Sequence, residues 1–119
     1  MRDFRKLKVW EKSHLLALAI YKATVAFPKE ELYGLTSQIR RAASSVPANL
    51  AEGCGRNGKQ DFVRFCHIAM GSASELEYHL LLARDLELLN GLEHKKLAMQ
   101  VAEIKQMLTA FIRRLKADS

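Results

Sequence analysis

The stretch LAMQVAEIKQMLTAFIRRL, residues 97–115, decides the fold. Its large apolar side chains recur at alternating intervals of four and three residues, which gathers them on one face of an α-helix. That alternation is typical of helices that pack side by side in bundles. We therefore expect a helix over residues 92–116, with a buried face formed by Leu97, Val101, Ile104, Leu108, Phe111 and Leu115.

The same helical period extends toward the N-terminus. We expect a first helix over residues 7–27, ended by Pro28 because the residue before a proline avoids the α region. A second helix begins at Leu35 and reaches the glycines that start at residue 53. Pro47 lies within it, and because proline removes a backbone donor we expect a kink or a short restart there.

A third helix is expected over residues 59–89, capped by Asn57 or Gly58 and stopped by Asn90-Gly91. Its predicted buried face consists of Phe62, Phe65, Ala69, Ala73, Leu76, Leu80 and Ala83. Four helices of about 20 residues with short connections predict an all-α protein, an antiparallel up-down-up-down four-helix bundle. We expect one domain spanning residues 1–119.

Composition supports this reading and excludes other classes. Only six Gly and two Pro stand among 119 residues, too few for the frequent turns of an all-β fold. The longest apolar run, residues 15–21, is far shorter than the about 20 residues of a membrane span. We identify no signal peptide, so we expect a cytoplasmic protein in which Cys54 and Cys66 are reduced thiols.

The run from Leu15 to Tyr21 is apolar around the whole circumference of the first helix. A helix of this kind is buried on more than one side. One short chain cannot easily cover both sides, so we expect a subunit interface there and a homo-oligomer.

The positive charge is unevenly distributed. Residues 1–60 hold eleven Lys or Arg and five Asp or Glu, whereas residues 61–119 hold eight of each. This localised excess predicts an anionic partner, RNA or DNA, although a solvated basic surface that only maintains solubility is the alternative. The candidate nucleic-acid-binding residues are Arg5, Lys6, Lys8, Lys12, Arg41, Arg56 and Lys59. Trp10 stands among these cations, and we expect it to pack into the bundle.

Two motifs imitate cofactor sites. Residues 53–58 read GCGRNG, a G-x-G-x-x-G, but no strand precedes them, so we interpret them as a corner between helices. A weaker hypothesis remains, in which Arg56 and Lys59 hold a phosphate beside free backbone N–H groups. Glu11 and His14 have the spacing of di-iron ligands, but no second such pair exists. We therefore expect neither a cofactor nor a metal.

Glu77 falls between apolar positions of the third helix, where a carboxylate needs a cationic partner. Arg40 and Arg41 are about 100° apart on the second helix, so only one can point inward. We expect the inward arginine to form a structural ion pair with Glu77 or Glu52; we assign Arg40 to this pair, although the sequence leaves open which of Arg40 and Arg41 is inward. We expect no catalytic role, because no nucleophile accompanies them. The protein is therefore not expected to be an enzyme.

A polar stripe lies opposite the apolar face of the second helix. Its side chains are short or carry amides, unlike the long charged side chains of a solvated face. We therefore favour a subunit interface or a channel lining for Gln38, Arg41, Ser45, Asn49 and Glu52.

Three segments carry a family resemblance: FRKLKVWEKS (4–13), YGLTSQIRRAASSVPANLAEG (33–53), and residues 62–80 with GSASELE at 71–77. Together they resemble the 23S ribosomal RNA intervening-sequence protein family, also called the four-helix bundle protein family. The resemblance implies a bundle assembled as a ring-like homopentamer. A related group, the accessory protein of diversity-generating retroelements, is a basic pentameric bundle that binds reverse transcriptase and nucleic acid. Gly58 stands where the family often has a Ser or Thr cap.

Two functional hypotheses follow. The first is a non-catalytic oligomer that binds RNA or DNA through its basic surface without strong sequence specificity. The alternative is a protein-interaction scaffold that docks a partner enzyme such as a reverse transcriptase.

Overall fold

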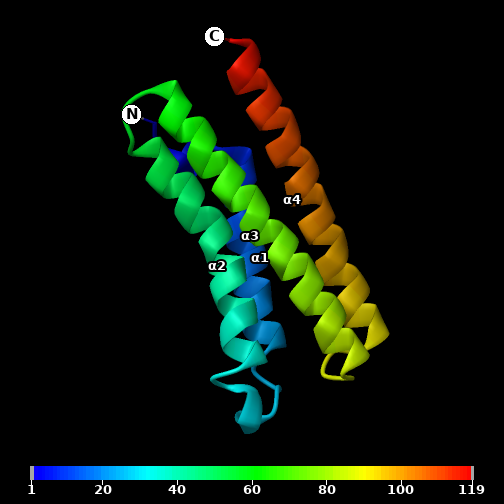
Figure 1. The fold of residues 1–119 in the computed structure, drawn as a ribbon. Helices are drawn as coiled ribbons and strands as arrows, with labels where there is room; N and C mark the ends of the chain where they lie inside the picture. The colour runs from blue at the N-terminus through cyan, green and yellow to red at the C-terminus, as the bar shows by residue number, and fades with distance from the viewer. Residues whose placement is uncertain (1, 119) are drawn as a thin grey trace.

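Four α-helices form the molecule (Figure 1), and the computed structural model describes residues 2–118. They are α1 (Lys8–Ala23), α2 (Leu35–Cys54), α3 (Lys59–Asp85) and α4 (Gly91–Ala117), and no strand occurs in this part of the chain. Two short 3-10 helices, η1 (Phe4–Lys6) and η2 (Lys29–Glu31), lie before α1 and before α2. The all-helical fold with four helices is therefore confirmed.

The helices lie side by side in a body of 46 × 23 × 19 Å. α2 packs against α1 and α3, and α4 packs against α1 and α3. The core between them contains the fully buried Ile20, Ile39, Leu50, Leu80 and Ile104. Every residue of the predicted buried face of α3 is buried.

In α4 the expected face is buried except at Phe111, which is half-buried while its neighbour Ile112 is buried. A straight helix has 3.6 residues per turn, so a face spaced at 3.5 residues drifts by about 20° per heptad. Phe111 therefore lies at the edge of the buried face. Its ring makes a T-shaped contact with the ring of Phe62, with the two ring centroids 5.7 Å apart.

α1 ends earlier than expected, at Ala23 instead of residue 27. The Thr24 hydroxyl donates to the carbonyl of Ile20 at 2.8 Å, a local bond that competes with continuation of the helix. The chain then turns so that Phe27 is buried ahead of Pro28. The sequence led us to expect a kink or a short restart of the helix at Pro47. No restart occurs, because α2 continues through this buried proline.

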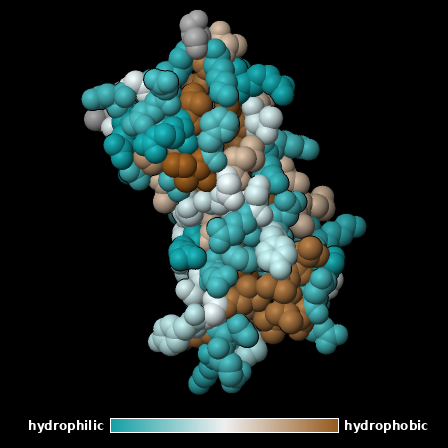
Figure 2. Space-filling view, in the orientation of Figure 1, coloured by the Kyte–Doolittle hydropathy of each residue, from teal (hydrophilic) through white to brown (hydrophobic). Residues whose placement is uncertain are grey.

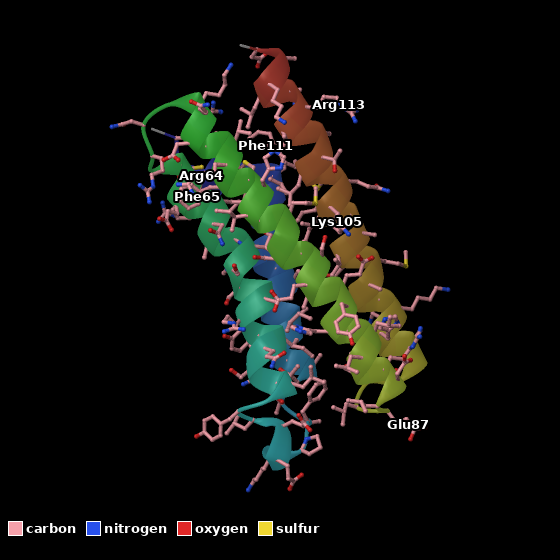
Figure 3. The ribbon with its side chains drawn as sticks, viewed as in Figure 1. Arg64, Phe65, Glu87, Lys105, Phe111 and Arg113 are labelled. Atoms are coloured by element: carbon pink, nitrogen blue, oxygen red, sulfur yellow. The ribbon has the colours of Figure 1, made fainter. Side chains whose placement is uncertain are left out.

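The end of α3 corrects the sequence-based prediction. The helix stops at Asp85, and Glu87 adopts a left-handed conformation with φ of 64° (labelled in Figure 3). The N–H of Leu88 donates to the carbonyl of Ala83 at 2.8 Å, and that of Glu87 to Arg84 at 2.9 Å. These two bonds form a Schellman motif. Asn90, expected to stop α3, instead caps α4 by accepting from the N–H of Glu93 at 2.8 Å.

The start of α3 has no side-chain cap. Gly58 is the N-cap residue, with φ of 93°, and no side chain, that of Asn57 included, forms a capping hydrogen bond with the helix. The positive φ explains the glycine, since other residues rarely adopt that conformation.

None of the helices in residues 2–118 is both long and apolar enough to cross a lipid bilayer.

Candidate nucleic-acid interface

Three parts of the chain meet at one end of the bundle: the N-terminal segment, the α2–α3 connection and the end of α4 (Figure 1). The backbone N–H of Arg2 donates to the carbonyl of Cys54 at 3.0 Å, which ties the N-terminal segment to the last turn of α2. Phe111 of α4 contacts Phe62 in the first turn of α3. We call residues 2–8, 52–64 and 113–118 the basic end.

The basic end carries the whole charge excess of the molecule. Its three segments hold ten Lys or Arg and four Asp or Glu, whereas the remainder of the chain holds nine of each. Figure 2 shows hydrophilic side chains gathered over this end, at the upper left of the view. Along the sequence, the excess of positive charge lies in residues 1–60. In the folded chain, the same net excess lies at one end of the molecule.

Aromatic rings support the arginines of this surface. The guanidinium of Arg2 lies 4.6 Å from the centroid of Phe62, and those of Arg56 and Arg64 lie 5.0 and 4.6 Å from that of Phe65. Figure 3 shows Arg64 and Phe65 at the start of α3. Such contacts attract the cation to the ring face and hold its position.

The N-terminal candidates differ in their partners. Arg5 lies 3.5 Å from the Asp3 carboxylate, and Lys12 donates to Glu103 of α4 at 3.1 Å. Lys6 and Lys8 are exposed at the basic end. Trp10 is half-buried against the core, as expected, and its ring stacks on that of His14 with the ring centroids 5.0 Å apart. Lys12 lies outside the basic end, and its ion pair offsets its charge.

The remaining candidates divide in the same way. Arg56 pairs with Glu52 at 2.8 Å, and Lys59 is half-buried in the first turn of α3. Arg41 is exposed in the second turn of α2, away from the basic end. The structure therefore brings together five of the seven candidates, namely Arg5, Lys6, Lys8, Arg56 and Lys59.

The predicted ion pair of Arg40 with Glu77 or Glu52 is wrong. Arg40 is the more buried of the two adjacent arginines, but its Nε donates to the Thr24 hydroxyl at 2.8 Å. Glu77 is exposed and accepts from Lys105 of α4 at 2.9 Å. Glu77 faces solvent beside α4 and not α2, so Arg40 has no buried carboxylate to meet.

The polar stripe of α2 was expected at a subunit interface or in a channel lining. Its centre is instead used within the chain, because the hydroxyl of Ser45 bonds that of Ser72 on α3 at 2.8 Å. Asn49 donates to the carbonyl and the hydroxyl of Ser45 at 2.8 and 2.9 Å. Short side chains here allow α2 and α3 to lie close, while Arg41 and Glu52 remain exposed.

Comparison with known proteins identifies the family. Residues 5–110 match the profile described as 23S rRNA-intervening sequence protein. The chain belongs to the 23S rRNA-intervening sequence protein family. Its fold is similar to the crystal structure of a protein of unknown function from the S23 ribosomal protein family of Bacteroides thetaiotaomicron VPI-5482. The TM-score is 0.79 at 28% identity, with 87% of this chain and 97% of that chain covered. No curated protein matches the sequence.

Three arginines of the basic end were not among the candidates that the sequence suggested, namely Arg64, Arg113 and Arg114. All three are exposed. The signal was available in the expected topology, since a four-helix up-down bundle brings the N-terminus, the second connection and the C-terminus to the same end.

Glu11 and His14 have the sequence spacing of a pair of metal ligands, but among the described residues the fold brings no further ligands to them. No cluster of three or more His, Cys, Asp or Glu that could hold a metal occurs in residues 2–118.

Both thiols of the intervening-sequence protein are buried near the basic end. Burial raises the pKa of Cys54, an effect that the charge of Arg2 partly opposes. Burial, followed by the neighbouring Cys54, raises the pKa of Cys66 to about 11. Both side chains are therefore neutral thiols at physiological pH.

Proposed function

We propose that this 23S rRNA-intervening sequence protein is a non-catalytic oligomer that binds RNA or DNA through the basic end, without strong sequence preference. The observation that carries the proposal is the concentration of the entire +6 charge excess at one pole. Arginines and lysines on such a surface neutralise phosphates whatever the base sequence. Neutral thiols and an exposed Glu77 paired with Lys105 support a non-catalytic role.

The proposal includes assembly into a ring-like homopentamer of antiparallel up-down-up-down bundles. Its support is the outer side of α1, where Leu15 is 56% and Leu18 49% exposed although both belong to a continuous apolar run. Burying these side chains against a second copy is favourable, at about 25 cal/mol per Å² of apolar surface. Five copies of a +6 chain carry +30, and repetition of one weak site raises avidity. We place the protein in the cytoplasm, where free thiols persist.

Binding is tested by titrating the protein with structured RNA and with duplex DNA at two salt concentrations. We expect binding to both that falls steeply with salt. Replacing Lys6, Lys8 and Arg113 by Gln should reduce the salt slope by about one for each lost phosphate contact. The matched control replaces Lys22, Lys29 and Lys95, three exposed lysines outside the basic end, and should leave the slope nearly unchanged. Absence of binding at low salt refutes the proposal.

Assembly is tested by measuring the mass in solution, with five times 13.5 kDa expected. Leu18→Glu, on the outer side of α1, should shift the mass to that of a single chain while the helical content is kept. Leu92→Glu is the control, because Leu92 is 73% exposed but lies on α4. A monomeric wild-type protein at high concentration refutes the assembly.

A second candidate is a scaffold that docks a partner enzyme such as a reverse transcriptase. Figure 2 shows a hydrophobic patch over the C-terminal end of α3, where Leu81 and Leu86 are exposed. Exposed apolar patches mark protein interaction sites. A pull-down that resists nuclease treatment and is lost in Leu86→Glu favours this candidate, whereas retention of the partner in that variant excludes the patch.

A further inference from the structure

A small pocket opens in the basic end between the N-terminal segment and the first turn of α3. Its volume is about 160 Å³, and Arg2, Arg56 and Lys59 line it together with Cys54, Gly58 and Phe62. Sites for drug-sized ligands measure about 300–1,000 Å³, so this pocket accepts a small group and not a whole nucleoside. Three cations facing such a space favour an anion.

The charge left over in the pocket indicates which anion. Arg56 is occupied by Glu52 at 2.8 Å and lies 3.9 Å from Asp61. Within residues 2–118, Arg2 and Lys59 form no ion pair, so their two charges are not offset. A phosphate monoester carries about −1.5 to −2 at pH 7 and matches them, whereas an internal phosphodiester carries a single charge.

The pocket also holds its donors in place. The guanidinium of Arg2 lies over the ring of Phe62 at 4.6 Å, and its backbone N–H is tied to Cys54. An arginine stacked on a ring keeps the N–H groups at its edge free for a planar fork of hydrogen bonds to phosphate oxygens. The first turn of α3 adds backbone N–H groups that no side chain caps.

The inner wall of the pocket is closed. Cys54 and Phe62, which line it, are each only 2% exposed, so they form its floor. An internal diester needs two exits for the continuing strand, whereas a terminal phosphate needs one. The shape and the charge of the pocket therefore both favour a terminal phosphate over an internal phosphodiester.

We propose that the pocket lined by Arg2, Arg56 and Lys59 binds the terminal phosphate of a nucleic-acid strand. The inference rests on the proposed function, which it deepens by naming the end of the strand as the ligand. Arg2 and Lys59 neutralise the monoester, and the exposed lysines Lys6 and Lys8 meet the phosphates that follow.

The test compares short single strands of one sequence that carry either a 5′-phosphate, a 3′-phosphate or only hydroxyl ends, using fluorescence anisotropy. We expect a phosphorylated end to raise affinity about tenfold, which corresponds to about 1.4 kcal/mol. Arg2→Gln and Lys59→Gln should each remove most of this preference. Lys29→Gln, on η2 at the opposite end of the bundle in Figure 1, makes the same charge change and should retain it. Thermal unfolding of each variant verifies that the fold is kept.

A second measurement separates this inference from the proposed function. Inorganic phosphate is titrated while the amide NMR signals of Gly58 and Lys59 are recorded. If all strands bind equally and phosphate leaves both signals unmoved, the pocket is overturned and nucleic-acid binding stands. If phosphate moves both signals, Lys59→Gln abolishes the change and no strand binds, the pocket takes free phosphate. The inference about strand ends and the proposed function then both fail.

Discussion

Gly53 of α2 faces the ring of Phe62 on α3 so closely that a β-carbon at position 53 would lie 2.9 Å from Cδ1 of that ring. The same β-carbon would lie 2.9 Å from Cβ of Phe65. Both phenylalanines also support arginines of the basic end. The glycine therefore sets the separation of α2 and α3 at the place where the candidate interface is built.

Gly53→Ala should destabilise the fold by about 1–3 kcal/mol, the usual cost of overpacking a tight contact. Gly71→Ala is the matched control, because Gly71 is also inside a helix but nothing lies within 4 Å of an added β-carbon. That variant should gain about 0.5–1 kcal/mol through the higher helix propensity of alanine. Urea unfolding measures both, and equal shifts in the two variants would contradict the close contact.

Arg40 and Arg41 should respond differently to substitution by alanine. Arg40→Ala loses the bond to the Thr24 hydroxyl and the stacking on Tyr21 at 4.9 Å, so we expect a loss of about 1–2 kcal/mol. The loss stays moderate because Thr24 keeps its own bond to Ile20. Arg41 is exposed, and Arg41→Ala should change stability by no more than about 0.5 kcal/mol. Equal unfolding free energies for the two variants would refute this division.

The helices and their buried faces could be predicted because apolar spacing within one helix is a local property of the sequence. Residues such as Leu76, Leu80 and Ile104 follow directly from it. The partner of Glu77 could not be predicted, since the choice between α2 and α4 depends on how α3 is rotated in the bundle. Hydropathy alone left Glu77 between apolar neighbours, yet the structure turns it outward to Lys105.

The candidate interface could be predicted only in part, because it too depends on how distant parts of the chain are placed by the fold. Lys59 comes to the same end of the molecule as Lys6 and Lys8 only after the chain has folded, and the arginines at the end of α4 join them from the far end of the sequence. A count of charge along the sequence finds the first group and misses the second. The rings under Arg2 and Arg56 depend on side-chain packing, which spacing does not reveal.

Glu87→Gly should stabilise the protein by about 0.5–1 kcal/mol. Glu87 holds φ of 64° at the position of the Schellman motif where glycine is usual, and an L-residue other than glycine pays a steric cost there. Glu87→Ala keeps that cost and serves as the control, with little change expected. Chemical denaturation of the three proteins gives the comparison, and a destabilised glycine variant would contradict the strain.

Cys66 should make the stability of the protein fall at alkaline pH. Its thiol titrates near 9.0 ordinarily and at about 11 in the fold, because burial disfavours the thiolate. The folded state therefore binds the proton more tightly than the unfolded state, so the contribution is fully present below pH 9 and is lost as the pH rises toward 11. Two pKa units correspond to about 2–3 kcal/mol at the upper limit.

In Cys66→Ala this part of the pH dependence should vanish, although the variant starts from a lower stability at pH 7 because of the small cavity it creates. Unfolding free energies of both proteins between pH 7 and 10.5 measure the effect: the difference between them should narrow steadily above pH 9. Parallel curves over that range would show that the thiol at position 66 is not held neutral by the fold.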